Sequence, residues 1–591
     1  MKSIYYDKVT LDSGYLADKQ KLNETVTINA VYDRFYDTGR IGAFDFDWKE
    51  GDDKKPHIFW DSDVAKWMEG AIYIYAKTGD KDLLEKVETL IEKIKKHQLD
   101  DGYFNIYYTV CNPEGRFTNR DKHELYCAGH LLEAAVAYAE VTGKTDFLDC
   151  MEKYTDLIHR VFVVEKSAQF DTPGHEEIEY ALIRAYRFTG KVKFLELAEY
   201  FINTRGSEND RDRAAYNQSH KPVREQDSAV GHSVRAVYLY TAMAALAKEK
   251  EDERLFDACK KLYDDIMTKM YVTGGIGSTR YGEAFTVPYD LPNDTAYTET
   301  CAGIGLAMFA NEMLSLENNA KYADTVERVI YNGILSGLSL DGKSFFYENP
   351  LEITLGARYN LPWKEVRMPI TQRVECFGCS CCPPNINRFF GSLSRFFFAV
   401  DSDTLYINQF ASSTLKDGDI TCTVRTDYPI SGKIEVSASG VQKVAVRIPW
   451  WCDKFSIDCD YEMKDGYAFI SEENAVIEFD MTPFVLYADP RVIRDEGKAC
   501  VMRGPVVYCA EGIDNGVLHS LTLKTPLEIT EKTDEYYGLV TLEAAGFKKQ
   551  NFSGSIYSKT PPVAEKTTVK LIPYNSFANR GETDMAVWLD N

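Results

Sequence analysis

Helical periodicity dominates the chain from Trp60 to about residue 400. The first run repeats apolar residues at the spacing of an amphipathic helix, and Asp61 or Ser62 is a candidate N-cap. Gly79 suits the left-handed conformation that ends many helices. A second helix is predicted from residue 80 to about residue 96. The two runs together predict a helix–turn–helix hairpin.

The same hairpin pattern recurs four more times, at spacings of roughly 45 to 70 residues. Polar hinges separate the paired apolar runs at residues 141–144, 188–191, 248–252 and 316–319. A sixth helical segment is predicted over 385–393. Repeated helix pairs form either an open solenoid or a closed ring. Six pairs, irregular loops and the lack of distinct capping repeats favour a closed (α/α)6 barrel.

Period-two alternation replaces the helical pattern near Asp401. It predicts short strands such as 405–410, 420–424 and 444–448, which continue through Val506–Tyr508 and indicate a β-sandwich. Weaker strand signals after residue 511 indicate a second small β-domain. We therefore predict three domains: 1–400, the (α/α)6 barrel; 401–510, a β-sandwich; and 511–591, a small β-domain.

The first 55 residues carry no clear helical period. Short extended runs such as Thr25–Ile28 make this segment mixed. Its start has no apolar core of the kind that marks a signal peptide, and no stretch approaches the roughly 18 apolar residues of a membrane span. We therefore expect a cytoplasmic protein with reduced thiols.

Composition narrows the classes of partner. The net charge of −23 argues against nucleic acid and anionic membrane surfaces, because both require a basic face. The 38 Tyr and 31 Phe residues suit either a carbohydrate site or a large core. The same net charge disfavours a strongly anionic substrate.

The densest chemistry lies in a run of cysteines. Four of the fourteen fall within seven residues, at positions 376, 379, 381 and 382. Upstream, Glu299 and Cys301 place a carboxylate and a thiol two positions apart. Such a ligand set suits zinc. The spacing alone leaves three alternatives open: a structural zinc knot, a redox pair, or a reactive thiolate at a metal.

Other candidate residues lie on the loops between helices. His130, His175 and His232 each follow a Gly near the start of the first helix of a pair, which predicts three imidazoles around one rim. A satisfied helix-start histidine is the alternative for each. Glu283 lies in a loop sixteen residues before Glu299, where a solvated carboxylate is the ordinary expectation. No G-x-S-x-G or H-E-x-x-H motif is present.

Seven stretches, taken jointly and in order, resemble glycoside hydrolase family 127, the retaining β-L-arabinofuranosidases with a zinc-bound cysteine nucleophile. They lie at residues 60–67, 271–278, 282–285, 299–302, 381–385, 503–508 and 571–574. The resemblance implies an (α/α)6 barrel followed by β-sandwich domains. It also implies an oligosaccharide or small glycoside substrate. The family often pairs subunits through its β-domains, which makes a homodimer one option for this chain.

The resemblance assigns roles residue by residue. Cys381 matches the nucleophile and Glu283 the general acid/base. Glu299, Cys301, Cys381 and Cys382 match the zinc ligands, and His130, His175, His232 and Tyr347 match positions that hold the sugar. Cys376 and Cys379 are additional thiols whose role stays open. The expected activity is release of terminal β-L-arabinofuranose; the alternatives are another furanoside or pyranoside, or a carbohydrate-binding protein with a structural zinc.

Overall fold

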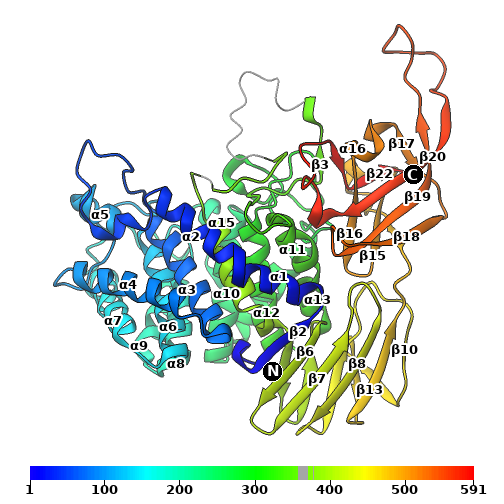
Figure 1. The fold of residues 1–591 in the computed structure, drawn as a ribbon. Helices are drawn as coiled ribbons and strands as arrows, with labels where there is room; N and C mark the ends of the chain where they lie inside the picture. The colour runs from blue at the N-terminus through cyan, green and yellow to red at the C-terminus, as the bar shows by residue number, and fades with distance from the viewer. Residues whose placement is uncertain (357–369, 377) are drawn as a thin grey trace.

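Six helices form a closed ring in the computed structural model, which describes residues 1–356, 370–376 and 378–591 (Figure 1). Each inner helix packs against the next, and the last packs against the first. They are α3 (Trp60–Thr78), α6 (Glu124–Thr142), α8 (Ile178–Thr189), α10 (Ser233–Lys250), α12 (Thr300–Leu316) and α15 (Cys382–Gly391). The inner helices are buried almost all round, because they contact both neighbours and an outer layer. The predicted (α/α)6 barrel is confirmed.

The outer helices follow from the hairpin pattern. Five of them come directly after their inner partners: α4 (Lys81–His97), α7 (Asp146–His159), α9 (Val192–Thr204), α11 (Glu253–Met267) and α13 (Ala320–Arg328). Gly79 ends α3 in the left-handed conformation, as expected, and the side chain of Asp80 accepts hydrogen bonds from the first turn of α4.

The N-cap expected at Asp61 or Ser62 is wrong. Helix α3 begins at Trp60, and both residues are fully buried inside its first turn. The Asp61 carboxylate accepts a hydrogen bond from the Ile106 backbone, and Ser62 donates to the Phe59 carbonyl. These side chains therefore tie the start of α3 to neighbouring segments.

The sixth outer helix comes from the other end of the chain. Helices α1 (Tyr15–Leu22) and α2 (Ile28–Asp37), joined by a π-helical turn at Asn23–Thr27, pack against α15. The extended run expected at Thr25–Ile28 is therefore wrong. Side-chain bonds fix this pairing, since Gln20 and Asn23 donate to carbonyls of α15. Tertiary contacts override the strand preference of the β-branched residues.

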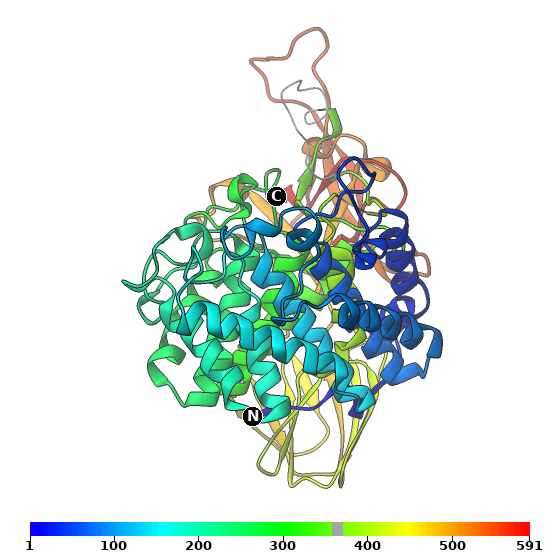
Figure 2. The same cartoon turned by 90° about the vertical axis from the view of Figure 1, so that its left-hand side faces the viewer.

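Two six-stranded sheets lie beside the barrel and share its continuous core (Figure 1). One contains β4 (Phe398–Asp401), β5 (Thr404–Ile407), β9 (Lys443–Arg447), β12 (Tyr467–Ile470) and β11 (Tyr461–Lys464). The other contains β10 (Phe455–Ile457), β13 (Asn474–Phe479), β8 (Lys433–Ser439), β7 (Ile420–Thr426) and β6 (Ser412–Asp417). The N-terminal strands β1 (Lys2–Ser3) and β2 (Val9–Ser13) complete one sheet each. Figure 2 shows the helices in front of these strands.

The third sheet closes on itself through six strands in the order β15–β22–β17–β19–β20–β16. These are β15 (Lys498–Arg503), β22 (Trp588–Asp590), β17 (Leu521–Leu523), β19 (Leu539–Lys549), β20 (Ala564–Pro573) and β16 (Val506–Glu511). The expected boundary at residue 510/511 falls inside this sheet, because β15 precedes it and β16 spans it. We propose a division between β13 and β14 (Phe484–Leu486) instead, with residues 1–13 counted with the sandwich.

Candidate active site

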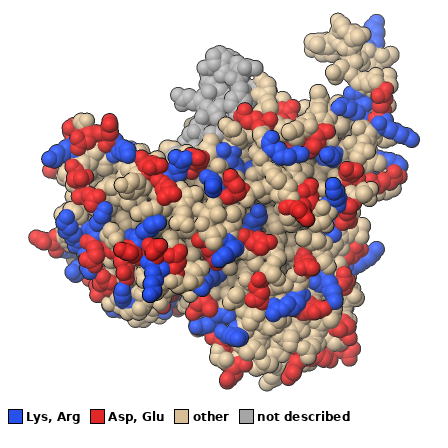
Figure 3. All heavy atoms as spheres, in the orientation of Figure 1, with Lys and Arg blue, Asp and Glu red and all other residues tan. Residues whose placement is uncertain are grey.

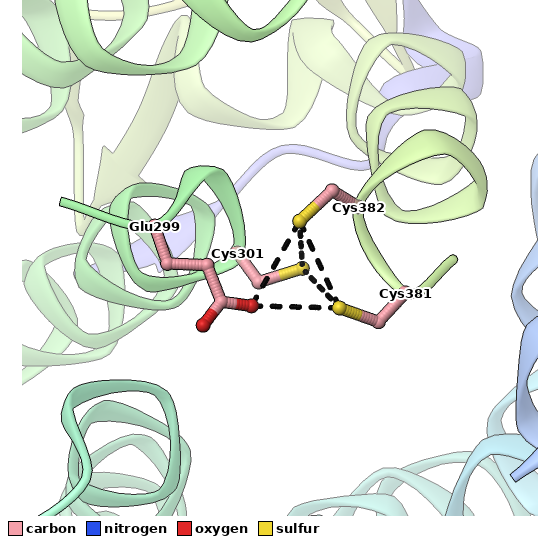
Figure 4. Close-up of side chains that lie close together, drawn as sticks. All are labelled: Glu299, Cys301, Cys381 and Cys382. Atoms are coloured by element: carbon pink, nitrogen blue, oxygen red, sulfur yellow. Dashed lines mark hydrogen bonds between the residues drawn. The ribbon is translucent and has the colours of Figure 1, made fainter. Parts of the chain in front are cut away.

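Two neighbouring ring helices bring the cysteines and the carboxylate together (Figure 4). Glu299 is the N-cap residue of α12 and Cys301 lies in its first turn, while Cys381 and Cys382 occupy the N-cap and first positions of α15. The Cys301 sulfur lies 3.3 Å from that of Cys382 and 3.6 Å from that of Cys381. One Glu299 oxygen lies 3.4 Å from the Cys381 sulfur. Helix starts that meet at one end of the ring create this cluster.

The cluster has the donor set of a metal site. Three sulfurs and one carboxylate oxygen all lie within 4.8 Å of one another. Glu299, Cys301 and Cys382 are buried and Cys381 is half-buried, so one donor remains accessible. The second Glu299 oxygen is buried without a hydrogen bond in the described chain. A buried carboxylate and three thiols without a cation are costly, so this cluster could bind a metal.

The electrostatics of the metal-free cluster reflect crowding of acidic groups. Burial, Cys381 and Glu283 raise the pKa of Glu299 well above its usual range. Burial and the sulfurs of Cys301 and Cys381 raise the pKa of Cys382. Burial opposes ionisation of Cys301, but the sulfurs of Cys381 and Cys382 outweigh it and lower its pKa to about 6. Without a cation, only a few of these acidic groups can therefore be ionised at the same time.

Glu283 faces this cluster and is not a solvated loop residue. It is 8% exposed and lies in a short turn with a left-handed backbone, φ 54°. A carboxylate oxygen of Glu283 lies 2.7 Å from His232 Nε2. One carboxylate oxygen of Glu283 lies within 4.8 Å of a ring nitrogen of His232 and of a carboxylate oxygen of Glu299. A second carboxyl group is therefore held beside the thiol cluster.

His232 has a defined orientation. It caps α10, and its Nδ1 accepts a hydrogen bond from the Val234 backbone at 3.2 Å. The proton of a neutral ring then sits on Nε2, which donates to Glu283. The same contact keeps Glu283 aimed at the cluster.

The three predicted histidines lie on one surface, but not at equivalent helix positions. His130 lies within the second turn of α6, His175 precedes α8, and His232 caps α10. All three lie near the start of a helix, and only His175 and His232 precede one. The ring centres of His175 and His232 are 5.7 Å apart. The Tyr126 ring lies between His130 and His175, with its centre 4.5 Å from that of His130 and 4.2 Å from that of His175.

These imidazoles are neutral. Burial lowers the pKa of both His130 and His175 well below the usual range, and nearby cations add to the effect. His130 Nδ1 lies 3.1 Å from an oxygen of buried Glu177, but neither ring nitrogen of His130 has a hydrogen-bond partner among the described residues. His175 is held through its Nδ1, which lies 3.1 Å from the Glu176 carbonyl, so its other nitrogen can face a ligand.

Tyr347 joins the cluster from a loop that runs beside the start of α12. Its hydroxyl lies 3.5 Å from the Cys381 sulfur and 3.9 Å from the Cys379 sulfur. Cys376 contacts the Ser380 hydroxyl at 2.8 Å. Among the described residues, the four-donor cluster includes neither Cys376 nor Cys379.

Sequence patterns missed two further residues of this site. Lys66, on α3, is fully buried; its ammonium lies 3.1 Å from the Tyr126 hydroxyl and 3.4 Å from the Cys381 carbonyl. Burial favours the neutral amine, but the negative fields of Cys381 and Asp63 outweigh it and raise the lysine pKa. His123 caps α6, 5.5 Å from His175. The neighbours of Lys66 on α3 include Asp63 and Glu69, so no sequence pattern marks this lysine as a site residue.

A membrane-spanning segment is absent from the described chain: none of its helices has the length and apolar character required. On the face shown in Figure 3, Lys and Arg side chains are interspersed with Asp and Glu. The surface in that view therefore offers no continuous basic patch.

Comparison with known proteins agrees with this geometry. Residues 8–395 match the GH127 β-L-arabinofuranosidase catalytic domain, and residues 483–590 match the family 127 C-terminal domain. The non-reducing end β-L-arabinofuranosidase of Bifidobacterium longum subsp. longum is 33% identical over 90% of this chain and 89% of its own length.

Solved structures give the same result. A GH127 β-L-arabinofuranosidase from Geobacillus stearothermophilus T6 is 36% identical, with a TM-score of 0.92 over 98% of this chain and 99% of its own. A second GH127 β-arabinofuranosidase is 33% identical, with a TM-score of 0.90 over 100% and 97% of the two chains. The chain therefore belongs to glycoside hydrolase family 127.

Proposed function

We propose that this enzyme is a retaining exo-glycosidase that removes terminal β-L-arabinofuranose from the non-reducing ends of small glycosides. The observation that carries the proposal is the half-buried Cys381 thiol beside Glu299, with the Glu283 carboxyl on the open side of the same cluster. A retaining mechanism needs a nucleophile and a proton donor close enough to act on one glycosidic bond. The activities named for the 33% and 36% identical relatives support the choice of sugar.

Cys381 would act as the nucleophile. Its sulfur attacks the anomeric carbon as the bond to the leaving oxygen breaks, and Glu283 gives that oxygen its proton. Glu283 then takes a proton from water, whose oxygen displaces the sulfur and restores the thiolate. The two inversions return the original anomeric configuration. The His232 contact at 2.7 Å holds Glu283 for both proton transfers.

Zinc is the metal that we propose for the cluster. Glu299, Cys301, Cys381 and Cys382 would hold it, since sulfur with one carboxylate oxygen is a donor set that zinc accepts. When bound, it would supply the positive charge that keeps the thiols ionised at neutral pH. The orphan oxygen of Glu299 and the close sulfurs are the features that fit.

The sugar would lie between the cluster and the histidine surface. His130, His175 and His232 offer neutral imidazoles, and Tyr347 offers a hydroxyl 3.5 Å from the Cys381 sulfur. Such groups bind sugar hydroxyls through directed hydrogen bonds. A different furanoside or a pyranoside remains the alternative substrate. The earlier predictions of a cytoplasmic address and of a homodimer stay predictions.

Two substitutions test the assigned roles. Cys381→Ser should lower hydrolysis of an aryl β-L-arabinofuranoside at least 1,000-fold, and Glu283→Gln should do the same for an alkyl β-L-arabinofuranoside, whose leaving oxygen must be protonated. Glu283→Gln should retain partial activity on substrates with a good leaving group, since those need no proton. Cys452→Ala, in the sandwich, is the matched thiol control. Activity of Cys381→Ser near that of the control would refute the nucleophile assignment.

A further inference from the structure

A second cavity lies at the opposite end of the barrel from the candidate active site. Its volume is about 520 Å³, within the roughly 300–1,000 Å³ of small-molecule pockets. The wall includes Tyr73 near the end of α3, Arg184 on α8 and Asn311 on α12. The site cysteines and His232 lie at helix starts, so the two sites occupy opposite mouths. Residues 2–6 of the N-terminal segment lie across this one.

Half of the charged side chains that line this cavity form ion pairs within the protein. Arg184 pairs with Glu69 and Glu133 at 2.7 Å each. Arg187 pairs with Glu249 at 2.8 Å and with Glu312 at 3.0 Å. These pairs make a rigid polar wall whose charges largely cancel.

Four charged side chains on the wall form no ion pair within the described chain: Lys2, Glu140, Lys248 and Arg395. Lys2 is exposed and Lys248 donates to the Met1 carbonyl at 2.9 Å, which leaves two groups without a partner. Arg395 and Glu140 both line the cavity, and neither side chain forms a hydrogen bond or an ion pair within the described part of the chain. Both are only partly exposed, so they are incompletely hydrated as well. A guanidinium and a carboxylate that share a cavity without meeting each other lack the partners that such groups normally have.

Tyrosine rings supply the rest of the surface. Tyr6, Tyr73 and Tyr180 line the cavity, and the rings of Tyr6 and Tyr73 meet edge to face at 4.6 Å. Tyrosine gives an apolar face for C–H groups and a hydroxyl for polar contacts. Arg395 donates and Glu140 accepts, so a ligand with several hydroxyl groups would satisfy both. An anion would meet Glu140, and a cation would meet Arg395.

We propose that this cavity is a second ligand site, for a neutral polyhydroxylated molecule of monosaccharide size, held by Arg395 and Glu140. The proposal does not depend on which sugar the enzyme hydrolyses. The bound molecule would place vicinal hydroxyls at the two unmatched charges and its C–H face on a tyrosine.

Crystals of the full chain soaked separately in L-arabinose, D-xylose and D-galactose test the site directly. At least one sugar should appear in the cavity within hydrogen-bond distance of both Arg395 and Glu140. Calorimetric titration with that sugar should show at least tenfold weaker binding to Arg395→Met and to Glu140→Gln. Binding at the catalytic mouth should be unchanged in both variants.

Controls keep the outcome decisive. Arg425→Met changes an exposed arginine of β7 and should bind the sugar like the original enzyme. If Arg395→Met fails to fold, Tyr6→Phe removes one hydroxyl of the same wall and should weaken binding instead. Water alone in the cavity in all three soaks overturns the proposal. So does capture of citrate or inorganic phosphate there with no sugar bound.

Discussion

Lys66 places a positive charge beside the cysteine cluster. Lys66 is fully buried, and no carboxylate of the described chain lies within ion-pair distance of it. Its contacts are the Tyr126 hydroxyl and the Cys381 carbonyl. A buried ammonium is costly without negative charge nearby, and Cys381 and Asp63 are the groups whose fields compensate it. Lys66 is thus a positioning residue for Cys381.

Replacement of this charge should slow the chemistry more than the binding. We expect Lys66→Met to lower kcat about 100-fold with KM changed less than threefold, because the nucleophile loses a nearby cation. Lys66→Arg should recover part of the loss. The rate of Cys381 alkylation by iodoacetamide, followed by mass spectrometry, provides a readout apart from turnover. An unchanged alkylation rate in Lys66→Met would contradict this role.

His123 should make stability depend on pH. Burial and the nearby Arg235 lower its pKa to about 3, whereas an unfolded histidine titrates near 6.5. Below pH 6.5 the unfolded chain therefore binds a proton that the folded chain does not, and stability falls as the pH falls. His123→Asn keeps a residue that tolerates the left-handed backbone, φ 59°.

Comparison of His123→Asn with the original enzyme isolates the effect of this histidine on stability. Relative to the original enzyme, His123→Asn should gain up to about 1.4 kcal/mol in unfolding free energy between pH 7.5 and pH 5.5. Urea denaturation at several pH values measures the difference. A difference that does not vary with pH would show that His123 is protonated in the folded state.

At the scale of elements, one outer position of the ring is filled from the N-terminus. Asn23 in the turn between α1 and α2 donates to the Asn387 carbonyl at 3.1 Å, and the Asn387 amide donates back to Asn23 at 2.9 Å. Both residues are fully buried. This reciprocal pair attaches the N-terminal helices to α15.

Asn23→Leu should cost about 2–4 kcal/mol, because Asn387 would be left with unpaired buried groups. Asn29→Leu, on the exposed face of α2, is the control and should change stability by less than about 0.5 kcal/mol. Chemical denaturation measures both. Equal effects of the two substitutions would mean that the buried pair is not what holds these helices.

Periodicity predicted the five consecutive hairpins because their helices are adjacent in sequence and carry strong caps, such as Gly79. It could not predict α1 and α2, whose partner α15 lies more than 300 residues away and decides their conformation. The position of Glu283 beside the thiols came from family resemblance alone. Lys66 and His123 escaped notice because a lone lysine or histidine has no pattern until the fold supplies its neighbours.

At the scale of the whole molecule, the cluster joins two helix ends and lies at one mouth of the ring. Cys301 and Cys382 are two members of a much larger hydrophobic core that runs through the ring and the sandwich. The metal should therefore matter more for turnover than for folding, in contrast to small domains that fold only around zinc.

Removal of the metal by prolonged dialysis against a chelator should abolish hydrolysis, and added Zn²⁺ should restore it. The midpoint of thermal unfolding should fall by only a few degrees, since the remaining core is large. Calorimetry with and without chelator gives the comparison. Loss of helical circular dichroism at 25 °C after chelation would assign the metal a structural role instead.

The N-terminal contribution to the ring has a consequence for biosynthesis. Asn23 and its partner are 364 residues apart, and a ribosome adds about 5–20 residues per second. After synthesis of α1, α2, β1 and β2, a time on the order of tens of seconds therefore passes before their partners emerge from the ribosome. Until then the apolar side of α2 and the edges of β1 and β2 are uncovered. Closure of the ring is in this sense a late event, which the growing chain can complete only after about two thirds of it has been translated.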